Sequence, residues 1–263
     1  MKGGEINNMG YERVHEMLRE MKLDGIEKTL DSTVQKWSKK NSDAFELIEE
    51  LLNSQRMYNE EKRYRTRLRY SGLPFHKRME DFDFSFQPSI DVKQIRELET
   101  LRFMYEKENV IFLGPPGVGK THLAIGLAMK AIEEGNKVYF INSIKLVERM
   151  KDAFSKMSYE RLLRFYKSLD LLIIDELGYL PLDVEGAKLF FELIESKYEK
   201  GSIIVTSNRS FTEWNKIFSD SVLATAVLDR LLHHSSIVNI RGKSYRLKEK
   251  QKNGIMGAKV LGI

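Results

Sequence analysis

One segment constrains the fold of this 263-residue chain more than any other, the run Gly114–Thr121 with the sequence GPPGVGKT. It matches the phosphate-binding pattern G-x-x-x-x-G-K-[ST] at every fixed position. A short apolar run, residues 109–113, precedes it, and a helical pattern with Leu123, Leu127 and Ala131 on one side follows it. A strand, a glycine loop and a helix start in this order create a concave site of backbone N–H groups that binds phosphate. The sequence therefore predicts a nucleoside triphosphate site.

The residue types of the loop fit this chemistry. Gly114, Gly117 and Gly119 can adopt positive φ and let backbone N–H groups close on oxygen atoms. Lys120 supplies a positive charge for the β- and γ-phosphates, and Thr121 supplies a hydroxyl for Mg²⁺. The alternative is a glycine turn before an ordinary helix, but the flanking strand and helix favour the phosphate site. The predicted nucleotide-binding residues are Gly114, Pro115, Pro116, Gly117, Val118, Gly119, Lys120, Thr121 and His122.

Composition narrows the class of protein. Hydrophobic residues make up 42% of the chain and charged residues 31%, which is typical of a soluble globular protein. No apolar run approaches the roughly 20 residues that cross a bilayer, and residues 1–17 lack the apolar core of a signal peptide. The chain has no cysteine, which excludes disulfides and thiolate metal sites. We expect a cytoplasmic protein without a membrane partner.

The net charge of +5 is unevenly distributed. Residues 229–263 carry eight basic and two acidic side chains, which exceeds the whole net charge. A basic surface on a nucleotide-binding protein makes nucleic acid a reasonable partner, although a solvated charged face is an equal alternative for any single run. Arg241, Lys243 and Arg246 are the candidate DNA contacts in this region.

Residues 9–70 predict a small all-helical N-terminal domain, residues 1–72. Apolar residues with the spacing i, i+3, i+4 and i+7 mark its first helix, namely Val14, Met17, Leu18 and Met21. Gly25 and the Ser/Thr/Lys-rich residues 32–42 interrupt the helical pattern. A second helix begins at Ala44 and is expected to continue toward Tyr70.

The end of this second helix combines basic residues with tyrosines. The basic residues could bind the phosphates of a nucleic acid, and Tyr64 and Tyr70 could stack on its bases. The alternative is an exposed helix end that carries the cations favoured by the helix dipole. Both interpretations remain open for the candidate DNA contacts Lys62, Arg63, Arg65, Arg67 and Arg69.

Residues 73–95 predict an irregular connector. Phe82, Phe84 and Phe86 alternate, so one face of a short extended segment is expected to pack on the next domain, with adenine contact as a lesser alternative. A helix over residues 95–105 then leads into the larger domain, residues 96–250.

Strand and helix patterns alternate from Asn109 onward, which predicts an α/β fold with a parallel sheet and crossover helices. The expected strands cover residues 109–113, 137–141, 171–175, 203–206 and 236–240. The expected helices lie near residues 120–134, 143–154, 158–167, 187–198 and 221–233. Near-continuous apolar strands fit a five-stranded sheet that is covered on both faces.

Two adjacent acidic residues, Asp175 and Glu176, mark the end of the third expected strand. Asp175 is predicted to lie beside the Mg²⁺ of the phosphate-loop site, together with Thr121. Glu176 can orient and polarise an attacking water. Because a small-molecule kinase needs an acceptor hydroxyl and not this second acid, the pair favours hydrolysis over the kinase alternative. Two acids at an ordinary strand end are the remaining alternative.

Two further residues are catalytic candidates. Asn208 follows the fourth expected strand, next to the phosphate-loop strand, and could hold the lytic water and sense the γ-phosphate. Arg230 could act on the nucleotide of a neighbouring subunit and stabilise the transition state there, or it could pair locally on a helix surface. Arg209 and Arg246 are weaker candidates for an auxiliary cation.

The histidines predict no metal site. His233 and His234 are adjacent and are expected to point away from each other on a helix. His122 follows the phosphate loop and is expected to pack against or orient its surroundings, while His15 and His76 are isolated. We assign no zinc.

With these residues in view, the chain resembles the IstB family of AAA+ ATPases, which help insertion-sequence transposition and are related to the bacterial helicase loader DnaC. The resemblance covers residues 63–250. It includes Phe82-Asp83-Phe84 with Gln87–Asp91, Gly117–Ala124, Ile174–Leu182, Thr206–Asn208, Ala226–Leu231 and Gly242–Leu247. The Glu-Leu-Gly-Tyr and Ser-Tyr-Arg motifs within these segments are more specific than the phosphate loop.

The resemblance implies an ATP- and Mg²⁺-dependent protein that binds duplex DNA, forms homo-oligomers through AAA+ interfaces and activates a transposase. By family pattern, Lys120 and Thr121 bind ATP and Mg²⁺, Asp175 and Glu176 serve hydrolysis, Asn208 is the sensor and Arg230 acts in trans. The partner-binding region would be residues 1–70. A helicase loader with the same core is the alternative. The tail, residues 251–263, falls outside the resemblance.

Overall fold

The structure, a computed structural model, describes residues 8–40, 43–218 and 220–252. It divides into two compact units, Met1–Thr66 and Arg67–Ile263. The division falls within helix α3 (Ala44–Tyr70), whereas the sequence led us to expect a boundary at residue 72. The last turn of α3 belongs to the second unit because Nε of Arg67 donates to the carbonyl of Ile132 at 3.2 Å.

The first unit comprises α1 (Asn8–Glu20), α2 (Asp24–Lys40) and most of α3. Gln55 of α3 is buried, and its Oε1 accepts from the N–H groups of Gly25 and Ile26 at 2.9 and 3.2 Å. Free N–H groups at the start of α2 are thereby satisfied by a neighbouring helix. A Cβ on Gly25 would lie 2.7 Å from the Cα of Gln55, so a glycine is required at this crossing.

The expected interruption over residues 32–42 is wrong over its described part, because α2 continues to Lys40. The hydroxyls of Ser32 and Ser38 donate to the carbonyls of Thr29 and Gln35, both at 2.9 Å. These serines thus bond within the helix and do not draw the backbone out of it. Residues 41 and 42 lie outside the described residues.

The second unit is built on the predicted five-stranded parallel sheet, which is confirmed. Its strands are β1 (Asn109–Leu113), β2 (Val138–Asn142), β3 (Leu171–Leu177), β4 (Ser202–Ser207) and β5 (Ser235–Asn239). Their spatial order is β2-β3-β4-β1-β5, and all neighbours pair in parallel. Strand β4 therefore lies between the strand before the phosphate loop and the strand that carries the acid pair. Because parallel strands end at one edge, the functional residues of all three strands meet there.

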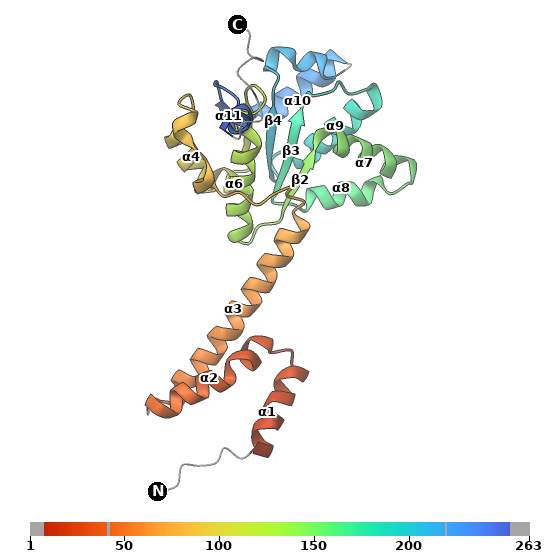
Figure 1. Ribbon diagram of the computed structural model, residues 1–263. Coiled ribbons are helices and arrows are strands. Elements are labelled where there is room, and N and C mark those ends of the chain that lie inside the picture. The colour runs from red at the N-terminus through yellow and green to blue at the C-terminus, as the bar shows by residue number, and fades with distance from the viewer. Residues whose placement is uncertain (1–7, 41–42, 219, 253–263) are drawn as a thin grey trace. The chain divides into compact units, whose positions relative to one another are not determined.

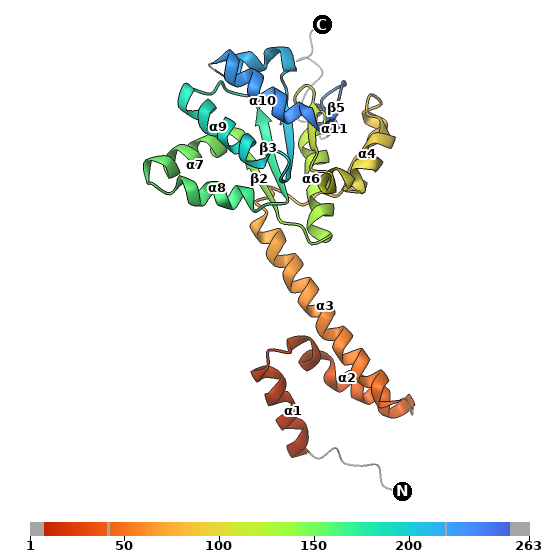
Figure 2. The ribbon, with the colours of Figure 1, turned by 180° about the vertical axis from the view of Figure 1, so that it is seen from behind.

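Helices cover both faces of the sheet (Figures 1 and 2). Helix α6 (Lys120–Glu133) packs on one face, with α4 (Val92–Glu99) against it. The opposite face carries α7 (Ser143–Ser155), α8 (Tyr159–Lys167), α9 (Val184–Lys197) and α10 (Ser221–His233). The core on that side joins sheet residues such as Ile174 to Phe190 and Leu231 of the helices, all fully buried.

Both edges of the sheet are covered by segments that precede β1. The N–H of Phe140 on edge strand β2 donates to the carbonyl of Ser71, just after α3, at 2.7 Å. On the other edge, Nε2 of Gln94 in α4 donates to the carbonyl of Ile237 in β5 at 3.1 Å. These contacts occupy backbone groups that an open sheet edge would expose for pairing with another chain.

Two expectations for the segment before β1 are corrected. The connector forms short 3₁₀ turns, η1 (Met79–Asp81) and η2 (Phe84–Phe86), in place of an extended strand. Asp83 causes this in part, because its Oδ1 accepts from the N–H of Phe86 at 3.2 Å. The helix expected over residues 95–105 is divided at Leu101, whose φ is +59°, into α4 and α5 (Arg102–Tyr105).

Two elements complete the second unit, the 3₁₀ helix η3 (Phe211–Lys216) and the C-terminal helix α11 (Tyr245–Lys252). Among the described residues, none of the helices combines the length and the apolar character that crossing a membrane requires.

Candidate nucleotide-binding site

The phosphate loop connects β1 to α6 at the carboxyl edge of the sheet. Gly117 and Gly119 have φ of +80° and +102°, in the left-handed region that favours glycine. A Cβ on Gly117 would lie 2.1 Å from Oγ of Ser244, and one on Gly119 would lie 2.4 Å from the Phe82 ring. Segments from both ends of the second unit therefore close around the loop, at a distance that glycine alone allows.

Lys120 is the first residue of α6 and is 9% exposed. Its Nζ donates to the carbonyls of Gly114 and Pro115 at 2.7 and 2.9 Å. Burial lowers the pKa of Lys120, and the carboxylates of Asp175 and Glu176 act in the opposite direction. The ammonium group binds an anionic phosphate oxygen more strongly than a neutral carbonyl oxygen. Lys120 can therefore exchange these two carbonyl contacts for contacts with phosphate.

Asp175 and Thr121 meet as the sequence predicts for a Mg²⁺ site. The hydroxyl of Thr121 donates to Oδ1 of Asp175 at 2.9 Å. Asp175 is buried at the end of an apolar strand. A hydroxyl and a carboxylate side by side form the hard oxygen donor set that Mg²⁺ prefers, so these residues fit the ion.

Thr206 connects the two acids and was not assigned a role from the sequence. Its hydroxyl donates to Oδ1 of Asp175 at 2.6 Å and accepts from the N–H of Glu176 at 2.9 Å. Thr206 is fully buried at the end of β4, between β1 and β3. It therefore holds the acid pair from the neighbouring strand, a role that depends on strand order.

Glu176 occupies a bulge of β3, where the register with β4 shifts between Ile174 and Leu177. Its φ is +58°, which is unusual for a residue with a side chain and turns the carboxylate out of the sheet. The side chain is exposed, whereas its neighbours Asp175 and Leu177 are buried. The bulge thus separates the two acids, with Asp175 beside Thr121 and Glu176 facing the pocket.

Asn142 is a second residue that sequence reasoning missed. Its Nδ2 donates to Oε2 of Glu176 at 3.0 Å, and its Oδ1 accepts from the N–H of Ile144 at 3.0 Å, which caps α7. The hydroxyl of Ser143 donates to the carbonyl of Glu176 at 3.0 Å. An asparagine at the end of an apolar strand was the available signal, because β2 ends at the same edge as β3.

A pocket of about 870 Å³ opens at this edge of the sheet. Its floor is the phosphate loop, with Glu176, Thr206 and Asn208 from the strand ends. The connector residues Phe75 and Phe82 form part of its wall, and Tyr245 and Arg246 of α11 form another part. This volume is in the range of small-ligand sites. The structure therefore brings the predicted sensor Asn208 to the same pocket as Lys120 and Glu176.

Helix α11 is bound to the phosphate loop. The N–H of Tyr245 donates to the carbonyl of Gly117 at 2.9 Å. Nζ of Lys248 lies 3.3 Å from Oδ2 of Asp83 and 4.2 Å from the centre of the Phe86 ring. Arg246 is thereby placed in the pocket, close enough for its charge to lower the pKa of Lys120. This position fits the auxiliary-cation interpretation of Arg246 better than a role confined to DNA.

His122 lines the pocket but is engaged with the connector. Its Nε2 lies 3.0 Å from the carbonyl oxygen of Arg78, and its ring packs edge-on against Phe82 at 5.2 Å. Burial lowers the pKa of His122. The residue has the packing and orienting position that the sequence suggested, at the rim of the nucleotide pocket.

Arg230 lies at the opposite end of the sheet from the phosphate loop of its own chain. It lines a small cavity together with Asn109 and Ile203, which are at the amino ends of β1 and β4. Its Nε forms an ion pair with Glu195, and its guanidinium lies 4.9 Å from the centre of the Phe191 ring. Within one chain, Arg230 cannot reach the nucleotide pocket.

Arg209 contacts the segment after the acid pair. Its Nε donates to the carbonyl of Gly178 at 3.4 Å, and its Nη1 lies 3.3 Å from Glu213. It does not line the pocket. Local pairing is therefore its role in this structure.

Most of the candidate DNA contacts in α3 have local partners. Arg65 pairs with Glu61 at 2.6 Å, and Lys62 lies 3.8 Å from Asp24. Arg69 stacks on the adjacent Tyr70 at 4.9 Å. Arg67 differs from these residues because its partner is distant in sequence: it bonds to the carbonyl of Ile132 and so has a structural role. Arg63, Arg241 and Lys243 are exposed, so the DNA role of these residues stays a prediction.

The prediction that His233 and His234 point away from each other is wrong. Their ring centroids are 4.1 Å apart. The prediction assumed a helix at both residues, but α10 ends at His233, and His234 has φ −126° and ψ 89°. The change of backbone direction turns the second ring toward the first.

Comparison with known proteins supports the nucleotide site. A family model described as IstB-like ATP binding protein matches residues 16–253. The ATP-binding protein named for insertion sequence IS21 of Pseudomonas aeruginosa is 45% identical over 240 residues, covering 91% of each chain. The corresponding protein named for IS5376 of Geobacillus stearothermophilus is also 45% identical, covering 91% of this chain and 96% of its own.

Solved structures show the AAA+ fold. AMPPCP-bound DnaA from Aquifex aeolicus superposes with a TM-score of 0.52 at 22% identity, covering 72% of this chain and 58% of that one. DnaI superposes with a TM-score of 0.54 at 19% identity, covering 62% of this chain and 90% of its own. At these identities the likeness concerns the fold alone.

Proposed function

The chain belongs to the family of IstB-like ATP-binding proteins, and on this premise we propose that it hydrolyses ATP, oligomerises on duplex DNA and assists a transposase. Similar proteins carry the names of insertion sequences. That context supports transposition over the alternative of helicase loading in replication. The basic segments and the position of Arg230 support the DNA and oligomer parts of the proposal.

The observation that carries hydrolysis is the separation of Asp175 from Glu176 by the bulge of β3. Asp175 is buried against the hydroxyls of Thr121 and Thr206. Glu176 faces the pocket with one carboxylate oxygen held by Asn142. This separation supports a role for Asp175 at a metal ion and a role for Glu176 at the attacking water, the two roles that hydrolysis requires.

We assign roles to this chain's residues as follows. Backbone N–H groups of the phosphate loop and Nζ of Lys120 bind the phosphates. Thr121 and Asp175 hold Mg²⁺, which neutralises developing charge on the phosphates when bound. Glu176 accepts a proton from the attacking water, and Asn208 orients that water. Arg230 of a neighbouring copy adds positive charge that stabilises the transition state.

Hydrolysis is tested by measuring phosphate release with and without duplex DNA. Glu176→Gln is expected to bind ATP normally and to lose hydrolysis, because the amide cannot accept the proton. Lys120→Ala is expected to weaken ATP binding about a hundredfold, since charged hydrogen bonds contribute roughly 1.5–3 kcal/mol each. The matched control is Lys130→Ala, on the same helix, where the lysine pairs with Glu134 at the surface.

DNA-stimulated phosphate release that Glu176→Gln abolishes is the expected result. A Glu176→Gln protein with unchanged hydrolysis would contradict the role of the acid. Transfer of the γ-phosphate to a small hydroxyl compound would instead establish the kinase alternative.

The partner is tested separately by co-precipitation of the full chain with the transposase and, in parallel, with the replicative helicase. Retention of the transposase alone is expected. Retention of the helicase alone would replace transposition by helicase loading and leave the ATPase assignment intact.

A further inference from the structure

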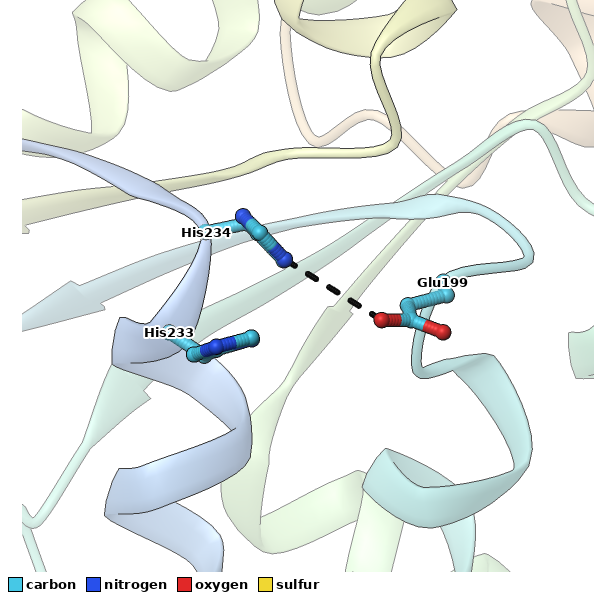
Figure 3. A group of neighbouring side chains, drawn as sticks. All are labelled: Glu199, His233 and His234. Atoms are coloured by element: carbon cyan, nitrogen blue, oxygen red, sulfur yellow. Dashed lines mark ion pairs between the residues drawn. The ribbon is translucent and has the colours of Figure 1, made fainter.

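Three side chains that could bind a metal converge at the end of the sheet opposite the nucleotide pocket. Glu199 lies in the turn after α9, His233 ends α10, and His234 follows it. One ligand atom from each lies within 4.8 Å of the others. Both imidazole rings extend from the end of α10 toward Glu199 (Figure 3). The distance between Nε2 of His234 and Oε1 of Glu199 is 4.0 Å. Two elements distant in sequence thus present two nitrogens and one oxygen to one volume.

Backbone geometry produces this convergence. His234 leaves the helix with φ −126° and ψ 89°, which brings its ring next to that of His233. Glu199 has φ +57°, so the chain reverses immediately after α9 and returns its carboxylate toward α10. The hydroxyl of Tyr198 lies 2.8 Å from Nδ1 of His233. This contact occupies one ring nitrogen and leaves Nε2 for another partner, as the outer contacts of metal-bound histidines do.

The local charges favour a cation at this position. The last carbonyls of α10 form the negative end of a helix dipole, and Glu199 adds a full charge. Of the nearby cations, Arg230 is neutralised by Glu195, and the ammonium of Lys197 is buried on the carbonyl of Leu169. Lys107 lines the adjacent cavity and remains as a competing charge.

We propose that Glu199, His233 and His234 form a binding site for one Zn²⁺ ion or a similar transition-metal ion. Imidazole nitrogens and a carboxylate oxygen are the donors that Zn²⁺ accepts at about 2.0–2.2 Å. Tetrahedral binding would bring the ligand atoms to about 3.4 Å from one another. The side chains of His234 and Glu199 are 49% and 62% exposed, so they can rotate into this geometry without moving the core. Water completes the fourth position.

The bound ion would link the turn after α9 to the end of α10. Arg230 lies one turn before His233 on α10. The site would therefore hold the helix that carries the predicted trans-acting arginine. It does not depend on ATP hydrolysis, because its ligands lie outside the nucleotide pocket.

Calorimetric titration of ZnCl₂ into the full chain, prepared without a histidine tag and in millimolar Mg²⁺, tests the site. One ion per chain is expected, with a rise in the thermal midpoint. His233→Ala, His234→Ala and Glu199→Gln are each expected to weaken binding by more than about a hundredfold, and Tyr198→Phe by about tenfold. The matched controls are His76→Ala, at an isolated exposed histidine, and Asp175→Asn, which removes the carboxylate of the nucleotide pocket; both are expected to retain full affinity.

Co²⁺ gives a second readout that does not depend on stability. A site with two imidazoles and one carboxylate is expected to produce the strong visible absorption of four-coordinate Co²⁺ in the wild type and none in His234→Ala. Unchanged Zn²⁺ affinity in Glu199→Gln would reduce the cluster to a surface histidine pair and overturn the proposal. Loss of binding in Asp175→Asn would place the ion in the nucleotide pocket and overturn it as well.

Discussion

The two ends of the parallel sheet differ in the open space beside their cationic side chains. At the carboxyl end, Lys120 contacts two backbone carbonyls beside a pocket of about 870 Å³. At the amino end, the cavity is only about 10 Å³, and two of the cations that line it, Lys197 and Arg230, have partners within the chain. Lys197 donates to Leu169 at 2.6 Å, and Arg230 pairs with Glu195.

Asn109 explains why the amino end is closed. Its Nδ2 donates to the carbonyl of Leu231 at 3.1 Å, and its Oδ1 accepts from the N–H of Ile203 at 3.0 Å. One side chain thus joins β1 to β4 and α10. At the carboxyl end, the polar groups instead line a pocket that a ligand can enter. The difference is that polar groups at the carboxyl end surround open space, whereas Asn109 at the amino end bonds neighbouring elements of the same chain to one another.

Arg230→Ala is expected to have a larger effect than Lys197→Met or Asn142→Ala, because Arg230 lies at the closed end and yet is assigned a catalytic role in a neighbouring copy. In an assembled oligomer, loss of a trans-acting arginine is expected to lower ATP hydrolysis by about 10³-fold. Nucleotide binding should be retained, since the pocket of the same chain does not contain the residue. Phosphate release and fluorescent-nucleotide titration measure the two quantities.

The control for Arg230 is Glu195→Gln, which removes the ion pair and leaves the arginine. It should change hydrolysis by no more than about fivefold, because the arginine remains and a partly exposed ion pair contributes only about 0–1 kcal/mol. A wild-type hydrolysis rate in Arg230→Ala would show that Arg230 contributes to packing and not to hydrolysis.

Lys197→Met tests whether the amino end of the sheet holds a buried, charged amine, because the substitution should change how stability depends on pH. Lys197 is 1% exposed, and burial lowers its pKa from 10.5 to about 8. The folded protein therefore carries a penalty for the charged amine below pH 8, and this penalty disappears as the pH rises toward 10.5. The free energy of unfolding of the wild type, relative to Lys197→Met, should increase by about 3 kcal/mol over this range.

Urea denaturation of both proteins between pH 7 and 10.5 measures this difference, and subtracting the two curves removes the contribution of other titrating groups. Parallel curves would show that Lys197 keeps an ordinary proton affinity in the folded state.

Asn142 provides the smallest and most selective change, at the open end. Asn142→Ala removes both the contact with Glu176 and the cap of α7, whereas Asn142→Asp preserves the cap. We expect hydrolysis to fall about tenfold in both variants, because Glu176 loses its orienting bond. The free energy of unfolding should fall by about 1 kcal/mol in the alanine variant only.

Steady-state hydrolysis and urea denaturation separate the two roles of Asn142. Faster hydrolysis in Asn142→Asp would mean that Asn142 restrains Glu176 and does not align it.

The nucleotide site was predictable in its contiguous parts. Residues 114–121 and the pair Asp175 and Glu176 carry their chemistry at fixed local spacing, so their identity and order are enough. The same holds for the strands, because apolar runs with glycine turns between them have few alternative structures. The connector was less predictable, since the cap that Asp83 places on Phe86 overrides the alternating phenylalanines.

The phosphate loop, the acid pair and the α/β sheet could be predicted from the sequence, since each depends on residues that are neighbours along the chain. Three relations became visible in the folded chain alone: Thr206 bonds to both acids, Asn142 bonds to Glu176, and Arg230 lies at the far end of the sheet. Those relations depend on the order β2-β3-β4-β1-β5 and on one bulge. Strand order is set by packing across the whole core, and no local pattern of residues records it.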